Sequence, residues 1–183
     1  MRRKIFFWMA IAGVGLISSC SSYNEKTEAG NRRASDKILQ QADGTISLKL
    51  EKADCYSDMV NPSSNTAEWN VVVSKSGRYN VWLSSATKDT TDLHYSNKVL
   101  VSVHDARLMA RPSCDKIIQN SNDVSYPYFK ADSFLGSMYI QDTGVYNIQV
   151  ISEKIFPKDY KAVESSGADI TKLLSVSFTP IIR

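Results

Sequence analysis

Two stretches of the chain repeat one pattern, and this pattern limits the fold more than any other feature. Residues 77–85 read GRYNVWLSS and residues 144–152 read GVYNIQVIS, and a polar turn precedes each. Both open with Gly-x-Tyr-Asn and then alternate apolar with polar side chains. Alternation with a period of two is typical of a strand that has one buried face. We therefore expect the fold to be organised around these two strands.

Other segments alternate in the same way. The further predicted strands are 45–52, 67–74, 99–104, 106–110, 134–141 and 173–181, with a short one at 55–60. Strand 78–85 should pair with 67–74 as a hairpin, strand 145–152 with 134–141 likewise, and 106–110 with 99–104. Residues 87–98, 111–132 and 155–170 are expected to be long loops. About eight strands with short turns, and no long amphipathic helix, predict an all-β fold, an antiparallel jelly-roll β-sandwich.

The first residues have the composition of an export signal. Met1–Lys4 is basic, and 5–17 is apolar apart from two glycines but too short to span a bilayer. The segment Ile17-Ser18-Ser19-Cys20 resembles a bacterial lipobox. The resemblance implies a lipoprotein signal peptide at 1–19 and a lipidated Cys20. An ordinary signal peptide, or a buried N-terminal segment, with Cys20 incidental is the alternative.

The residues after Cys20 are polar and charged until Ile38. We expect 20–43 to hold the lipidated cysteine and a flexible tether, with a short helical turn at 35–41, and a single domain at 44–183. Ser21 rather than Asp follows the cysteine, which resembles outer-membrane lipoproteins of the bacterial cell envelope. The formal charge of +3 includes three basic residues of the signal segment, so the mature chain is near neutral. A neutral chain argues against general nucleic-acid binding.

The strand pattern resembles a known family. The Gly-x-Tyr-x-Val strand at 77–81, the Gly-x-Tyr-x-Ile strand at 144–148, the short final strand and Glu51-Lys52-Ala53-Asp54 resemble the galactose-binding-like β-sandwich of carbohydrate-binding module families 6 and 35. The resemblance covers 45–181 and implies a carbohydrate ligand. The acid that often opens the family's last strand is replaced by Lys172 and Leu173. We therefore expect no cofactor, and structural calcium is the one ion that the resemblance leaves open.

Aromatic and basic residues in the long loops are the candidate ligand-binding groups. Flat rings suit the C–H faces of sugars, while amide, carboxylate and guanidinium groups bind hydroxyls. The alternative is that these rings hold the loops against the sandwich. The candidates are His94, Tyr95, Arg107, Arg111, Tyr126 and Tyr128.

Two cysteines remain after Cys20. Cys55 and Cys114 form an even pair in an exported chain, where a disulfide is chemically permitted. Such a bond would close a long loop and add about 3–4 kcal/mol of stability if unstrained. Two buried thiols are the alternative.

No motif for catalysis stands out. The sequence has no phosphate loop, no nucleophile elbow and no zinc-like spacing of Cys and His. His104 and Asp105 are neighbours, but neighbours in an extended chain point to opposite faces and do not pair. We therefore expect a non-catalytic carbohydrate-binding lipoprotein, held to the membrane by its lipid anchor. A structural or assembly lipoprotein whose sandwich docks an envelope protein is the alternative.

Overall fold

The chain folds into two stacked β-sheets, which confirms the all-β sandwich. The computed structural model describes residues 37–58, 60–156 and 171–181. These residues form eleven strands and two short 3-10 helices, η1 (Leu50–Lys52) and η2 (Pro62–Ser64). None of them belongs to a helix that is long and apolar enough to cross a membrane. The signal segment, Cys20 and most of the predicted tether lie outside the described residues.

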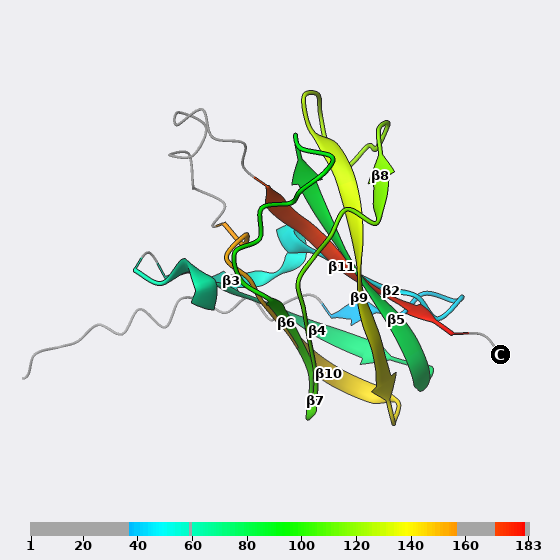
Figure 1. Ribbon diagram of the computed structural model, residues 1–183. Helices are drawn as coiled ribbons and strands as arrows, with labels where there is room; N and C mark the ends of the chain where they lie inside the picture. Colours follow the sequence, from blue (N-terminus) through cyan, green and yellow to red (C-terminus); the bar gives the residue numbers. More distant parts are fainter. Residues whose placement is uncertain (1–36, 59, 157–170, 182–183) are drawn as a thin grey trace, which may run out of the picture. The chain divides into compact units, whose positions relative to one another are not determined.

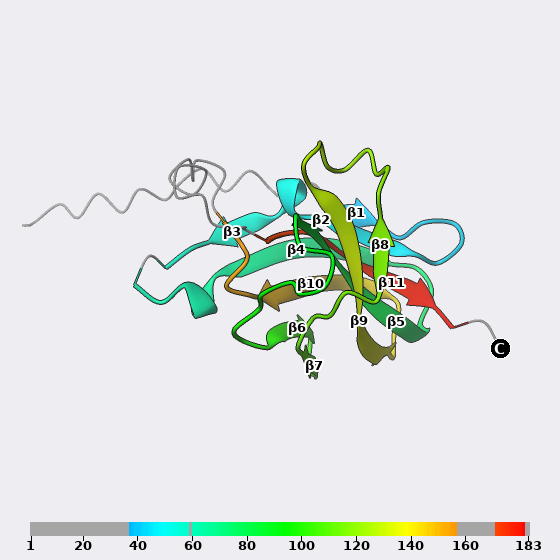
Figure 2. The same cartoon turned by 45° about the horizontal axis from the view of Figure 1, so that its top comes forward.

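The strands divide between the sheets as follows. Sheet A has the order β1 (Ile38–Leu39), β4 (Thr66–Val73), β10 (Gly144–Ile151), β6 (Val99–Val103), β7 (Ala106–Ala110), and β3 (Asp54–Tyr56) also pairs with β4. Sheet B has the order β2 (Ile46–Lys49), β11 (Lys172–Pro180), β5 (Gly77–Thr87), β9 (Phe129–Ile140), β8 (Lys116–Ile118). The pair of β1 and β4 is parallel and the other pairs are antiparallel. Figures 1 and 2 show the two layers.

The two predicted hairpins around the Gly-x-Tyr-Asn strands are wrong. The turn at residues 74–76 carries the chain from β4 in sheet A to β5 in sheet B, and the turn at 141–143 carries it from β9 in sheet B to β10 in sheet A. The strands then pair across the two units, β4 with β10 and β5 with β9. Alternation fixes which face of a strand is buried but not which strand lies beside it. A hairpin and a crossing between sheets satisfy the same pattern.

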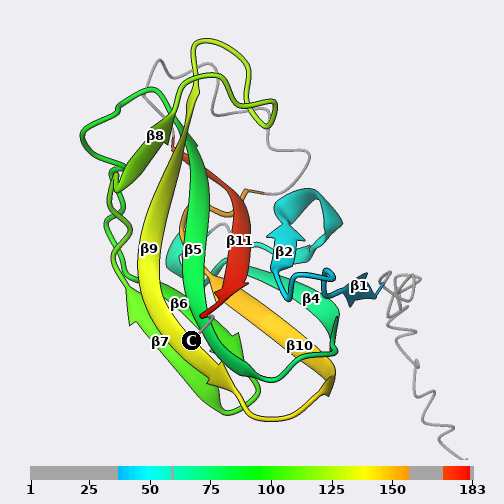
Figure 3. The ribbon, with the colours of Figure 1, turned by 90° about the vertical axis from the view of Figure 1, so that its right-hand side faces the viewer.

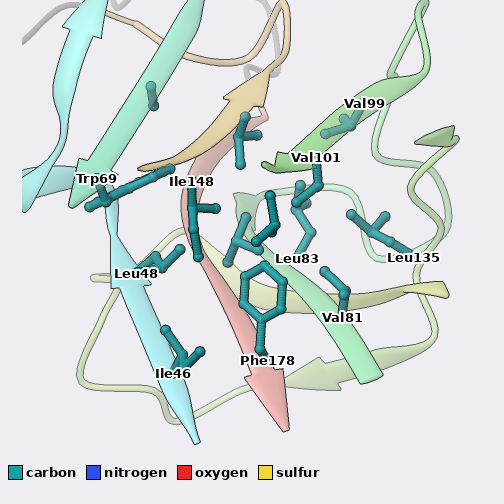
Figure 4. Close-up of a cluster of buried hydrophobic side chains, with 14 of the residues drawn as sticks. Ile46, Leu48, Trp69, Val81, Leu83, Val99, Val101, Leu135, Ile148 and Phe178 are labelled. Carbon is teal, nitrogen blue, oxygen red and sulfur yellow. The ribbon is translucent and has the colours of Figure 1, made fainter. Parts of the chain in front are cut away.

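The core lies between the sheets and is filled from both of them. Figure 4 shows side chains of sheet A, among them Trp69 and Ile148, meeting Leu83 and Phe178 of sheet B. Each of these four side chains is fully buried. The indole nitrogen of Trp69 donates to the carbonyl oxygen of Lys49 at 2.9 Å, so its one polar atom is satisfied in the interior.

The same corner precedes both Gly-x-Tyr-Asn strands. Gly77 and Gly144 have φ of +143° and +154°, which favours glycine. The Tyr79 hydroxyl donates to the carbonyl of Lys75, and the Tyr146 hydroxyl donates to that of Asp142 at 2.8 Å. Each tyrosine therefore ties its strand to the turn four residues earlier, as the tyrosine corners of other β-sandwiches do.

A side chain before β2 strengthens the first corner. The Gln40 amide oxygen accepts from the backbone nitrogens of Ser74 at 2.8 Å and Lys75 at 2.7 Å. Its amide nitrogen donates to the Tyr79 hydroxyl at 2.8 Å and to the Gly44 carbonyl at 2.6 Å. The helical turn predicted at 35–41 is wrong in its described part, because Ile38–Leu39 instead pair with β4 as β1. Pairing to an open sheet edge satisfies their backbone groups, which a single helical turn would leave free.

Most other predicted strands are confirmed, including the pair of β6 with β7. The first predicted strand ends at Lys49, where η1 begins. The loop predicted at 111–132 contains β8 and the first residues of β9, because Thr87 at the end of β5 pairs with Phe129. The 155–170 loop lies outside the described residues beyond Phe156.

Candidate functional site

The long connections gather at one end of the sandwich. Thr87 pairs with Phe129, Ala86 with Lys172, and Ile151 with Leu100. These registers bring residues 88–98 and 119–128, and the described residues 152–156 after β10, to the same end, which we call the loop end. The short turns at 74–76, 104–105 and 141–143 lie at the opposite end, which we call the corner end. Binding groups of β-sandwiches commonly lie on such long loops, held by a rigid scaffold.

Residues 119–129 enclose a hollow of about 460 Å³ at the loop end. Its lining combines three side-chain amides, a hydroxyl and aromatic rings. The lining residues are Gln119, Asn120, Ser121, Asn122, Val124, Tyr126, Tyr128 and Phe129. Tyr126 is 93% exposed, so its ring is open to solvent, whereas Tyr128 is half-buried. The Lys88 ammonium lies 5.4 Å from the centre of the Tyr128 ring and links this loop to the end of β5.

An ion-pair network holds this loop over the loop end of sheet B, where Figure 3 shows the connection between β8 and β9. The Asp123 carboxylate lies 2.8 Å from the Lys130 ammonium on β9 and 3.3 Å from that of Lys49 on β2. Lys130 in particular lowers the pKa of Asp123 below its usual value. The backbone nitrogen of Tyr128 donates to the carbonyl of Ser125 at 3.0 Å. The hollow is therefore shaped by fixed contacts although it is exposed.

Tyr126 and Tyr128 are the two predicted binding residues that the structure brings together. Tyr95 belongs to the core instead. It is 5% exposed and its hydroxyl lies 3.0 Å from the Ser85 hydroxyl. Burial raises the pKa of Tyr95. Its ring holds the 88–98 loop against the sandwich, so it cannot offer a face to a ligand.

His94 and the two predicted arginines do not line the hollow. His94 lies between two carboxylates, with Nε2 at 3.0 Å from Asp89 and Nδ1 at 3.4 Å from Asp92. Hydrogen bonds from the Thr91 hydroxyl and from backbone nitrogens lower the pKa of Asp89. This network shapes the 88–98 loop. Arg111 donates to the carbonyl of Ser96 at 2.8 Å, and Arg107 is exposed on β7, opposite Ser102.

The prediction that His104 and Asp105 do not pair is wrong. His104 Nε2 lies 3.2 Å from the Asp105 carboxylate. His104 has φ of +51°, so the chain turns there and the rule for extended neighbours does not apply. Both side chains are more than three-quarters exposed, which leaves the pair as a surface contact of the corner end.

The predicted disulfide is wrong, because Cys55 and Cys114 are both thiols in the structure. Cys55 lies on β3, which pairs with β4 in sheet A. Cys114 lies just before β8, which is an edge strand of sheet B. Burial, together with the nearby Asp89 and Asp92 carboxylates, raises the pKa of the Cys114 thiol. Within the described ranges, no three His, Cys, Asp or Glu side chains come together to hold a metal.

Sequence reasoning missed Gln119, Asn120 and Lys88. The run Gln119-Asn120-Ser121-Asn122 directly before the tyrosines was a usable signal, since clustered amides and rings are typical of sugar sites. Lys88 gave no such signal, because its position over Tyr128 depends on the pairing of β5 with β9.

The comparisons with known proteins support the fold. No protein-family profile and no curated protein matches the chain. An α-L-fucosidase from Vibrio sp. strain EJY3 is structurally similar over 78% of this chain, with 20% identity and a TM-score of 0.60. A GH26-CBM35 β-(1,4)-mannanase from Podospora anserina matches 77% of this chain with 10% identity and a TM-score of 0.44.

The match is to a part of each of these proteins. This chain covers 24% of the fucosidase and 28% of the mannanase. The chain is therefore similar in its β-sandwich fold to a part of that fucosidase.

Proposed function

We propose that this protein is a non-catalytic carbohydrate-binding lipoprotein that holds a glycan in the loop-end hollow. One observation carries the proposal. The open ring of Tyr126 shares an exposed hollow with the amides of Gln119, Asn120 and Asn122. A ring offers an apolar face to sugar C–H groups, and each amide offers both a donor and an acceptor to hydroxyls.

The size and chemistry of the hollow suit a short glycan segment. A volume of about 460 Å³ is in the range of small-molecule sites, and the described residues that line the hollow include no carboxylate and no cation. A neutral, hydroxyl-rich ligand fits such a lining, and the Lys88 ammonium close by lies over the Tyr128 ring. We further propose that the domain is related to carbohydrate-binding module families 6 and 35, which its sandwich fold supports.

The proposal includes attachment to the bacterial envelope. The lipobox-like segment before Cys20 supports acylation of that cysteine, and Ser21 after it supports an outer-membrane location. Several acyl chains on one residue anchor far more firmly than one. Mass spectrometry of the N-terminal peptide of the membrane fraction tests this part. A diacylglyceryl mass on Cys20 supports the anchor, and an unmodified Cys20 refutes it.

A glycan array followed by calorimetry tests the binding site. The panel contains neutral plant, host and bacterial polysaccharides, with α-L-fucosides included because of the fucosidase similarity. We expect the double variant Tyr126→Ala, Tyr128→Ala to lower the glycan affinity at least tenfold. Tyr126→Phe keeps the ring and should change the affinity less than threefold.

Tyr56→Ala is the matched control, since Tyr56 is also an exposed tyrosine, 52% accessible, but lies on β3. Absence of binding across the panel would refute the proposal. Capture of one envelope protein in a stoichiometric complex, together with unchanged sugar binding in the tyrosine variants, would favour the protein-docking alternative.

A further inference from the structure

The outer face of sheet A carries two rows of side chains that cross the sheet from edge to edge. Residues that pair directly on neighbouring strands share one face, and those that alternate with the buried residues of β4, β10 and β6 point outward. The row nearest the loop end is mainly apolar and contains Tyr56, Thr66, Ile151, Leu100 and Met109. Its two ends, Tyr56 on β3 and Met109 on β7, are 52% and 60% exposed. Packing of the core therefore does not account for this row.

The second row is polar, and its charges are separated by sign. It contains Asp54, Glu68, Gln149, Ser102 and Arg107. The two acids lie on β3 and β4, Gln149 lies on the middle strand β10 and donates to Glu68 at 2.6 Å, and Arg107 lies on β7 at the other edge. Figure 2 shows β4, β10, β6 and β7 in this order. Because neighbouring strands are about 4.8 Å apart, Asp54 and Arg107 are roughly 19 Å apart and cannot pair within one chain.

A second copy of the chain complements both rows. A two-fold axis along β10 turns the second copy over and reverses the order of its strands, so that β3 of each copy lies over β7 of the other at the same height. Asp54 then faces the partner's Arg107, and this ion pair occurs twice. Gln149 faces the partner's Gln149, and an amide both donates and accepts. In the apolar row, Tyr56 faces the partner's Met109. The face is therefore complementary to itself in charge and in polarity.

We infer that the protein forms a symmetric dimer through the outer faces of sheet A. Two sheets stack face to face about 10 Å apart, as the two sheets of the sandwich do. The strands of sheet A offer roughly 500 Å² per copy, or about 1,000 Å² for the pair, which is the lower limit for a specific interface. The dimer should therefore be of moderate affinity. Asp123 holds the hollow over sheet B, so each copy keeps its own open hollow and the glycan affinity per copy does not depend on the dimer.

Sedimentation equilibrium of the full chain in density-matched detergent tests the inference. We expect the unmodified protein to be mainly dimeric at about 100 μM. Arg107→Glu places an acid against the partner's Asp54, and Asp54→Arg places a base against the partner's Arg107, so each variant alone should weaken the dimer at least about tenfold. An equal mixture of the two variants should restore it, because the mixed dimer has opposite charges at both contacts. Arg78→Glu makes the same charge change at an exposed position of β5 in sheet B and is the matched control.

The mixture separates a lost contact from a lost fold, since two unfolded variants would not restore each other. Restored dimers in the mixture support the inference. A monomeric unmodified protein, a dimer that both charge variants leave intact, or a loss that the mixture does not restore would overturn it. Capture of a different envelope protein that Arg107→Glu releases, while the unmodified chain stays monomeric, would assign the face to that partner and also overturn the dimer. Calorimetry with a bound glycan on the same variants is independent of these outcomes, because the hollow lies on the other sheet.

Discussion

The two ends of the sandwich are built in different ways. At the corner end, residues 74–76 and 141–143 cross between the sheets, and tyrosine hydroxyls and the Gln40 amide tie these turns to the strands. At the loop end, longer connections are held by carboxylates such as Asp89 and Asp123, which are at least partly exposed. Buried, well-paired contacts add stability, whereas exposed ion pairs add little. The corner end therefore stabilises the fold, and the loop end is free to carry the site.

The largest effect should come from the first corner. Tyr79 is 1% exposed, so Tyr79→Ala leaves a cavity and removes the corner, and we expect a loss of about 3–5 kcal/mol in the free energy of unfolding. Tyr146 is half-buried, so Tyr146→Ala should cost clearly less. Urea titration measures both. Equal losses of stability in the two variants would show that the two corners contribute alike in spite of their different burial. A change in glycan affinity in either folded variant would show that the corner end also affects binding.

A medium effect is expected at Gln40. Gln40→Ala removes partners from the Ser74 and Lys75 nitrogens and from the Tyr79 hydroxyl, which we expect to cost about 1–3 kcal/mol. The neighbouring Gln41 is exposed, and Gln41→Ala should change stability by less than about 0.5 kcal/mol. Thermal and urea unfolding compare the two variants. If both cost the same, Gln40 does not hold the corner.

The smallest effect on stability should come from the loop end. Asp123→Asn removes an exposed ion pair, so the cost at pH 7 should stay within about 0.5 kcal/mol. Because Lys130 lowers the pKa of Asp123, the contribution of this carboxylate is present above its unfolded pKa of about 3.9 and is lost as the pH falls through the lower folded value.

The unmodified protein should therefore lose stability on acidification slightly more steeply than Asp123→Asn. Urea midpoints measured between pH 7 and pH 2.5 give the two curves. Lys130→Gln should flatten the curve in the same way, since Lys130 is the main cause of the shift. Parallel curves for all three proteins would mean that the pair does not anchor the loop.

The two ends also differ in how far the sequence predicted them. The alternation in 67–74 and 77–85 correctly indicated that Trp69 and Val81 face the core. It could not show that β4 and β5 lie in different sheets, because both arrangements bury the same faces. In the loops, Tyr95 and Tyr126 look alike in sequence. Ser85 lies beside Tyr95 in the core, whereas Tyr126 is 93% exposed among the described residues, and only tertiary structure supplies that difference.

Hydrogen exchange of the full chain, followed by mass spectrometry with and without a bound glycan, tests the central claim most directly. Exchange is slow where backbone hydrogen bonds are stable and changes where a ligand covers or orders the chain. We predict that the glycan slows exchange in peptides that cover 119–129 and leaves the peptides of 74–80 and 141–147 unchanged. Protection confined to the corner end, or no protection at 119–129 while the glycan is bound, would contradict this account.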